Sequence, residues 1–212
     1  MKELTTEKVA TMGNISIVRV GGVCAILAVV CLIMGRIAFG NEWLKSRGVD
    51  TLIPGHWFDT LGVLLFMIAA LGFYRALRQA GPLPLIAVVA TLTGSIFLIF
   101  HGFINLGIAY ELVPDTDALS QTDWLVSSVG TVLSFIGVLL FSFAVLRTSL
   151  VPKWIGWLGM ITVLGFCLQV LLPLVFSMAT PWFLSRVFGV WLVAMGVVLL
   201  RLKEPVAPDS VA

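Results

Sequence analysis

Charge is what this sequence has least of. The chain of 212 residues contains 13 Lys and Arg and 11 Asp and Glu, so charged residues make up only 11% of it. A soluble domain usually has about 25% charged and roughly 45–50% apolar residues, whereas 59% of this chain is hydrophobic. A soluble fold of this size has too little interior to bury so many apolar side chains. The composition therefore predicts a protein whose outer surface is covered by lipid.

Cysteines and clustered basic residues are also scarce. The net charge is +2 and the Lys and Arg residues form no dense patch, which argues against a nucleic-acid partner. The three cysteines, Cys24, Cys31 and Cys167, lie within apolar runs and lack the paired spacing of a disulfide framework or a zinc site. We therefore predict no metal site and interpret the cysteines as small packing residues.

Familiar catalytic motifs are missing as well. The chain has no Walker loop, no GxSxG, no HExxH and no CxxC. It also has no Lys in the middle of an apolar run, which a retinal Schiff base would need. We predict no catalytic residue. These absences favour a non-enzymatic protein and leave the question of an enzymatic activity open.

Long apolar runs are what the sequence does have. A membrane-spanning helix needs about 20 mostly apolar residues. Six stretches meet this requirement, approximately at 16–39, 57–78, 84–110, 124–147, 154–176 and 182–202. The pattern predicts an all-α fold, an integral membrane bundle of six transmembrane helices that forms a single domain over 1–212 with a short polar tail at 203–212.

Turn and capping residues mark the ends of these helices. Thr180 followed by Pro181 is typical of an N-cap with proline at the first helical position. Ser120 with Asp123 resembles a capping box, in which two side chains bond to the backbone at a helix start. We therefore expect the fourth helix to begin after Asp123.

The basic residues predict the orientation. If the N-terminus is cytoplasmic, nine of them lie on the inside: Lys2, Lys8, Arg19, Arg75, Arg78, Arg147, Lys153, Arg201 and Lys203. Four lie in or near the outer loops: Arg36, Lys45, Arg47 and Arg186. Cytoplasmic loops of membrane proteins carry an excess of Lys and Arg. The bias predicts that both termini are cytoplasmic.

Polar side chains gather in the outer third of the predicted bundle. His101 lies 17 residues after Pro84, so at 1.5 Å per residue it is roughly 25 Å along a hydrocarbon core of about 30 Å. Asn105 follows one turn later on nearly the same helix face. We predict that such residues line a polar vestibule that opens outward and binds a small ligand. The candidates are Arg36, His56, Asp59, His101, Asn105, Glu111, Gln169 and Arg186.

Two other interpretations of these residues remain open. The first is structural: His101 and Asn105 need only one hydrogen bond between helices, and the shallower groups are near water. The small hydroxyl residues of 124–147, including Ser134 and Ser142, likewise indicate close helix packing. The second is a redox site, because His56 and His101 lie at similar depth and could be axial ligands of a b-type haem.

One stretch resembles a known family. Residues 150–159, LVPKWIGWLG, and 190–196, VWLVAMG, resemble small bacterial multi-span membrane proteins that are catalogued as a domain of unknown function. The resemblance covers roughly the C-terminal third of the chain. It implies a bacterial inner-membrane protein, and it assigns no reaction and no catalytic residue.

The sequence thus predicts an uncharacterised multi-pass protein of the bacterial inner membrane. Its expected function is to bind or pass a small ligand through the outward polar pocket, with no cofactor. The alternatives are a structural or accessory subunit of a larger membrane complex and a b-type haem redox protein. The expected partners are the lipid bilayer and either another membrane protein or a second copy of this chain.

Overall fold

The chain is built from helices. The computed structural model describes residues 16–40, 52–176 and 184–202, with side chains described in these ranges except at 170–176 and 184–186. The helices are α2 (Ile17–Phe39), α4 (Leu52–Leu77), the short 3-10 helix η1 (Arg78–Ala80), α5 (Leu83–Ala109), α6 (Asp117–Arg147), α7 (Lys153–Phe176) and α8 (Leu184–Arg201). Within these ranges there is no strand, which confirms the all-helical class. The Thr180–Pro181 helix start lies outside the described residues.

Length and composition mark the chain as a membrane protein. Four helical segments are long and apolar enough to cross a bilayer: Ile17–Phe39, Leu52–Ala80, Leu83–Ala109 and Asp117–Arg147. Two shorter apolar helical segments, Lys153–Gln169 and Val187–Arg201, accompany them. Large apolar side chains cover the outside of the bundle; Phe100, for example, is 60% exposed. Such an apolar surface is stable in contact with lipid and unfavourable in contact with water.

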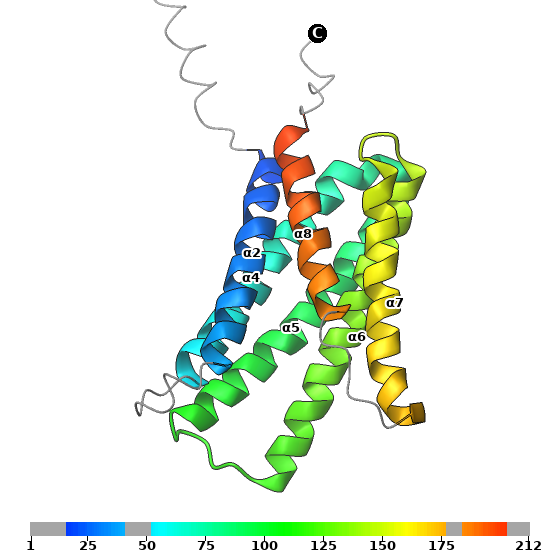
Figure 1. Cartoon of the computed structure of the whole chain (residues 1–212). Coiled ribbons are helices and arrows are strands. Elements are labelled where there is room, and N and C mark those ends of the chain that lie inside the picture. Colours follow the sequence, from blue (N-terminus) through cyan, green and yellow to red (C-terminus); the bar gives the residue numbers. More distant parts are fainter. Residues whose placement is uncertain (1–15, 41–51, 177–183, 203–212) are drawn as a thin grey trace, which may run out of the picture.

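The helices form a closed ring (Figure 1). Each helix packs against the next in the chain, and α8 packs against α2 to close the circle. Successive helices run in opposite directions, so the start of α2 and the end of α8 lie at the same end of the bundle as the α4–α5 and α6–α7 turns. The α5–α6 turn lies at the opposite end.

Close helix approach depends on small residues. Three glycine pairs lie at helix crossings: Gly21–Gly72 for α2 with α4, Gly22–Gly196 for α2 with α8, and Gly94–Gly130 for α5 with α6. A Cβ atom on Gly94 would lie 2.6 Å from the Gly130 carbonyl oxygen, which is too close for any side chain. In lipid, helices associate through such packing rather than through the hydrophobic effect. The expected role of Ser134 is confirmed, since its hydroxyl borders Gly94.

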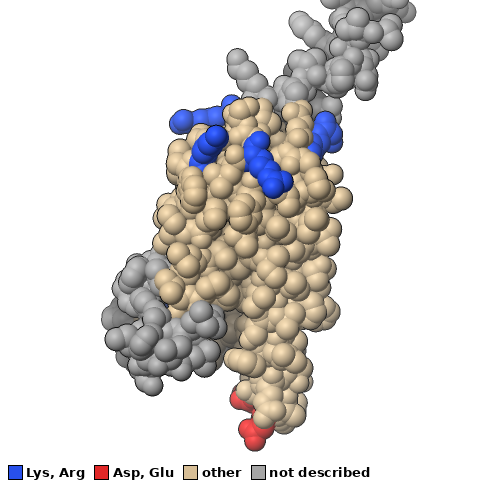
Figure 2. Space-filling model, turned by 90° about the vertical axis from the view of Figure 1, so that its right-hand side faces the viewer, with Lys and Arg blue, Asp and Glu red and all other residues tan. Residues whose placement is uncertain are grey.

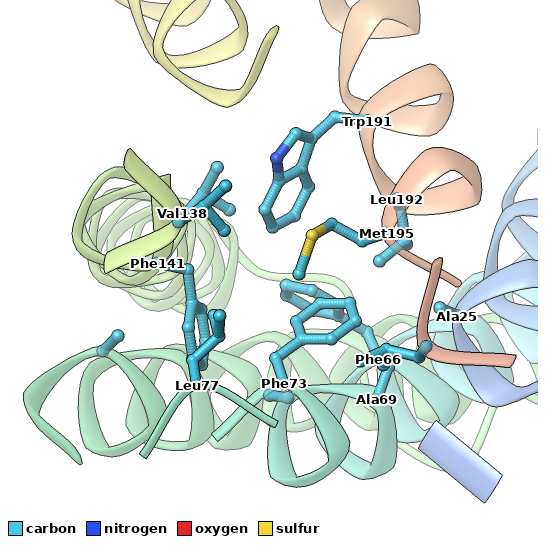
Figure 3. Packing of buried hydrophobic residues seen from close by; sticks show 14 of the residues in the cluster. Ala25, Phe66, Ala69, Phe73, Leu77, Val138, Phe141, Trp191, Leu192 and Met195 are labelled. Atoms are coloured by element: carbon cyan, nitrogen blue, oxygen red, sulfur yellow. The ribbon is translucent and has the colours of Figure 1, made fainter. Parts of the chain in front are cut away.

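Aromatic rings fill the centre of the ring of helices (Figure 3). Phe73 of α4 meets Phe141 of α6 and Trp191 of α8 edge-on, with ring centroids 5.6 and 5.8 Å apart. Phe188 of α8 stacks against Trp191 at 6.1 Å. Trp191 is fully buried. Edge-to-face aromatic pairs contribute about 0.5–1.5 kcal/mol each beyond the area they bury, so this cluster ties α4, α6 and α8 together.

Charge separates the two ends of the bundle (Figure 2). One end, called the basic end below, carries Arg19, Arg75, Arg78, Arg147, Lys153 and Arg201. The other, called the acidic end, carries Glu111, Asp115, Asp117 and Asp123, together with Arg36 in the last turn of α2. Three of the basic residues stand in the last turn of a helix, where they also complement the helix dipole.

Helix α6 starts seven residues before its predicted start. Its N-cap is Thr116, whose side chain accepts a hydrogen bond from the backbone N–H of Leu119 at 3.3 Å, and Asp117 supplies a negative charge in the first turn. The capping box predicted at 120–123 is therefore wrong. Because helix α6 begins two turns earlier, Asp123 lies on a helix face and not in a loop.

Candidate functional site

The acidic end holds a hydrogen-bonded group of polar side chains on α5 and α6. His101 Nδ1 lies 2.8 Å from Asp123 Oδ1. A carboxylate only accepts hydrogen bonds, so the imidazole carries its proton on Nδ1 and donates it to Asp123. The His101 side chain is 34% exposed and that of Asp123 is 15% exposed. Both side chains are therefore partly buried between the helices.

Asn105 completes the link between the two helices. Its side-chain amide nitrogen donates to Asp123 Oδ2 at 3.1 Å and to the His101 backbone carbonyl at 2.9 Å. Both partners are acceptors, which fixes the orientation of the amide. Its 3.2 Å approach to His101 Nδ1 is then a contact between two donors. Each oxygen of Asp123 accepts one hydrogen bond from α5, so this carboxylate is well satisfied.

A second carboxylate lies nearby on α4. The Oδ1 atom of Asp59 is buried and has no hydrogen-bond partner among the described residues. It lies against Gly35 of α2, where a Cβ atom would collide with it. Asp59 directly precedes Thr60, whose hydroxyl contacts Gly102 of α5, so this carboxylate lies near α5.

Helices α4 and α5 approach closely beside this carboxylate. Thr60 is 3% exposed and its hydroxyl lies where a Cβ atom on Gly102 would be. That hydroxyl also has no hydrogen-bond partner within the described ranges. Gly102 follows His101 directly, so the same contact that brings α5 against α4 also brings the imidazole toward Asp59.

We call the polar residues at this end the outer polar cluster: His101 and Asn105 of α5 and Asp123 of α6, which are hydrogen-bonded to one another, with Asp59 of α4 and the exposed Arg36 of α2 at the same end of the bundle. Sequence reasoning selected four of these five residues and missed Asp123. The missed signal was Thr116–Asp117, a second possible helix start that would have placed Asp123 two turns into α6.

The remaining candidates make other contacts. His56 packs edge-on against the ring of Phe39 of α2, with centroids 4.8 Å apart. Thus its ring faces α2, whereas that of His101 bonds to α6. Gln169 is half-buried on α7. The Arg186 side chain lies outside the described residues. Of the residues that the structure describes, no three His, Cys, Asp or Glu are grouped so as to hold a metal ion.

Glu111 ends helix α5. It is the one non-glycine residue with a positive φ in the described ranges, at 57°. Its N–H donates to the Ile108 carbonyl and that of Leu112 to the Gly107 carbonyl, both at 2.9 Å. This pair of bonds is the Schellman motif, which satisfies the last carbonyls of a helix. Glu111 is exposed, and its contacts identify it as a helix-ending residue.

An aromatic pair lies beside the cluster. The indole N–H of Trp57 donates to the Tyr110 hydroxyl at 3.2 Å, joining α4 to the end of α5. Both side chains are about half exposed, at 49% and 47%. Amphipathic rings of this kind collect at the level of lipid headgroups. The pair is consistent with an interface between lipid and water near the acidic end.

Comparison with known proteins gives a family and no activity. Residues 20–202 match the model of the family described as Domain of unknown function (DUF4386). The match covers most of the chain, so this protein belongs to that family. The resemblance seen in the sequence is thereby confirmed, and it extends well beyond the C-terminal third. No curated protein matches the chain, and no solved structure matches it.

Proposed function

We propose that this protein is a six-span protein of the bacterial inner membrane, with both termini cytoplasmic, that binds or passes a small polar ligand at the outer polar cluster. The separation of basic and acidic ends supports the orientation, because basic residues concentrate on the cytoplasmic side of membrane proteins. The antiparallel order of all six helices supports the span count.

One observation carries the ligand proposal: ionisable groups of four helices lie at the acidic end, where His101 and Asp123 bond across two of them and His101 remains 34% exposed. Helix packing alone does not require so many. A single hydrogen bond between helices satisfies a polar side chain in lipid, whereas this cluster holds two carboxylates, an imidazole, an amide and a guanidinium. Ionisable groups at membrane depth are functional candidates for this reason.

A panel of four simple solutes tests the proposal on the purified full chain in detergent. Methylammonium chloride, sodium acetate, glycine and glycerol represent a cation, an anion, a zwitterion and a neutral solute. At equal ionic strength, at least one should raise the melting temperature of the wild type, because a ligand that binds only the folded state stabilises it. The double variant Asp59→Asn/Asp123→Asn keeps the shapes of both side chains and should lose that increase.

The matched control is Trp57→Phe, which changes an exposed side chain at the same end and should respond like the wild type. Equal responses of the wild type and the double variant to all four solutes would contradict the proposal. The same preparation distinguishes the alternatives. A Soret band in its absorption spectrum would indicate a b-type haem protein, and a stoichiometric membrane-protein partner retained in mild detergent would indicate an accessory subunit.

A further inference from the structure

Helix α4 turns one row of large side chains toward the outside of the bundle. From Trp57 onward, its exposed large apolar residues lie three or four positions apart and so share one face of the helix: Trp57, Leu61, Leu64, Ile68 and Leu71. Arg75 follows Leu71 by four positions and is exposed as well. Arg75 therefore continues, at the basic end, the row that lipid covers.

Helices α2 and α6 repeat this arrangement. The exposed apolar row begins with Val23, Leu27 and Val30 on α2, and it ends with Val132, Ile136 and Phe143 on α6. Arg19 precedes the α2 row by four positions, and Arg147 follows the α6 row by four positions. Both arginines are exposed. Three helices thus each direct a basic residue toward lipid at the same end of the bundle.

The α4 row has the length of a bilayer. Arg75 follows Trp57 by 18 positions, which corresponds to about 27 Å at 1.5 Å per residue, close to the hydrocarbon thickness of about 30 Å. Helix α7 marks the same boundary, since Trp154 and Trp157 close to its start are each 58% exposed. Indole rings collect at the level of lipid headgroups. The arginine at the end of the α4 row therefore lies at headgroup level.

The protein does not neutralise the positive charge at this end. Six exposed basic residues lie there (Figure 2), and the described residues around them include no Asp or Glu. The ion pair between side chains that the described ranges contain lies at the opposite end. The segments that the structure does not describe hold five Lys or Arg and six Asp or Glu, a net charge of only −1. We call the six residues the basic collar: Arg19, Arg75, Arg78, Arg147, Lys153 and Arg201.

The basic collar surrounds the bundle. Its residues come from α2, α4, η1, α6, α7 and α8, which lie side by side around the closed ring of helices. A protein partner would meet only one side of such a collar, whereas a lipid leaflet surrounds all of it. Positive charge at a membrane surface attracts lipids whose headgroups carry a net negative charge. The partner that fits the collar is therefore an anionic leaflet.

From this placement we propose that the basic collar binds the headgroups of anionic phospholipids, with Arg19, Arg75 and Arg147 donating hydrogen bonds to their phosphate oxygens. A guanidinium matches a phosphate both in charge and in the geometry of its paired N–H groups. Each basic residue near a membrane surface favours an anionic lipid roughly fivefold. The inference concerns the end opposite the outer polar cluster, so it stands independently of the proposed ligand-binding function.

Electron paramagnetic resonance of spin-labelled lipids tests the inference on the full chain in phosphatidylcholine vesicles. The measured ratio compares the association of trace phosphatidylglycerol with that of phosphatidylcholine carrying the same label. Averaged over all lipids around the protein, the wild type should give a ratio of about two or more. Sodium chloride at 1 M should bring it toward one, because the Debye length falls to about 3 Å. The variant Arg19→Gln/Arg75→Gln/Arg147→Gln should lose about half of the preference, since it removes three of the six collar charges.

The matched control is Arg19→Lys/Arg75→Lys/Arg147→Lys, which keeps the three charges and should keep most of the preference. Thermal melting in phosphatidylcholine alone checks folding, and both variants should match the wild type because the replaced side chains are exposed. The wild-type ratio and its loss in salt need no variant, so they test the inference even where a variant is unstable.

Three results would overturn the inference. The first is a wild-type ratio near one, and the second is an equal ratio in the wild type and the glutamine variant. The third is a ratio that sodium pyrophosphate lowers more than sodium chloride does at equal ionic strength, because the collar would then bind a soluble phosphate compound in place of lipid.

Discussion

At the scale of single residues, the polar side chains of the acidic end divide into two kinds. Glu111 and Trp57 make contacts that a helix end or a lipid headgroup layer explains. His101, Asn105 and Asp123 instead bond to one another across two helices. Residues of the first kind stabilise a helix end or a position at the lipid surface. Residues of the second kind join α5 to α6 and also provide polar groups to a possible ligand. Their effect on stability and their effect on binding can be measured separately.

The link between His101 and Asp123 should contribute measurably to stability. We expect a double-mutant cycle of His101→Leu and Asp123→Leu to give a coupling of about 0.6–1.7 kcal/mol, the range of hydrogen bonds between membrane helices. Leucine roughly keeps the volume and removes the polar groups. The measurement is reversible unfolding of each variant in mixed detergent, from which the coupling is obtained by subtraction.

The Trp57–Tyr110 pair provides the comparison. Its hydrogen bond is 3.2 Å long and its two side chains are half exposed, so Trp57→Phe with Tyr110→Phe should show a smaller coupling. A coupling near zero for His101 and Asp123 would mean that water replaces the bond without loss, and the pair would then have no structural role.

At the scale of helices, the existence of the helices could be predicted from the sequence, because it depends on composition and on the length of apolar runs. Apolar length is enough to find the helices, because a span must be long and uninterrupted. The start of α6 was missed because two sets of capping residues compete for it, Thr116 with Asp117 and Ser120 with Asp123. A single sequence does not show which of the two sets caps the helix. That one choice decides whether Asp123 belongs to a loop or to the outer polar cluster.

Contacts between helices were less predictable than the helices themselves. The pairing of His101 with Asp123, and the approach of Gly35 to Asp59, depend on the rotation of each helix about its axis. Rotation follows from packing with neighbours, and the apolar residues on these helices are spread over all faces. Depth along the bundle could therefore be predicted for His101 and Asp59, whereas the partner of each could not.

The α5–α6 crossing offers a test at this scale. A Cβ atom on Gly94 would meet the Gly130 carbonyl oxygen at 2.6 Å and the Ser134 amide nitrogen at 2.7 Å. Neither backbone atom can move without separating the helices. Gly94→Ala should therefore destabilise the bundle by about 1–3 kcal/mol, as overpacking does. Because α5 and α6 carry His101, Asn105 and Asp123, a solute response that depends on the outer polar cluster should weaken together with stability.

Gly189→Ala is the matched control on α8. There a Cβ atom would make only ordinary contact, at 3.4 Å from a methyl group of Val29. Alanine also favours a helix over glycine by about 0.5–1 kcal/mol, so this variant should be as stable as the wild type or more stable. Thermal melting in the same detergent compares the two. Similar losses in both variants would refute the proposed close crossing of α5 and α6.

At the scale of the whole molecule, the two ends of the bundle differ in charge (Figure 2). The α4–α5 turn carries Arg75 and Arg78, and the α6–α7 turn lies between Arg147 and Lys153. The α5–α6 turn has acidic residues and no Lys or Arg. This division is what sets the orientation of a membrane protein during insertion.

Topology reporters check that orientation. A reporter fused after Gln79 should be active on the cytoplasmic side, and one fused after Ala118 on the opposite side, because the two positions lie at opposite ends of the bundle (Figure 1). An enzyme active only in the cytoplasm and one active only outside it give complementary readings. The reverse pattern at either position would contradict the six-span arrangement.

The closure of the ring by α2 and α8 has a consequence for how the protein is made. Gly22 and Gly196 meet so closely that a Cβ on either would lie 2.8 Å from the carbonyl oxygen of the other. Ribosomes add about 5–20 residues per second, so Gly196 is synthesised roughly ten seconds to half a minute after Gly22. We therefore expect the α2–α8 contact to form only after the last helix has left the ribosome, so that a chain truncated before α8 leaves this side of α2 without its helix partner.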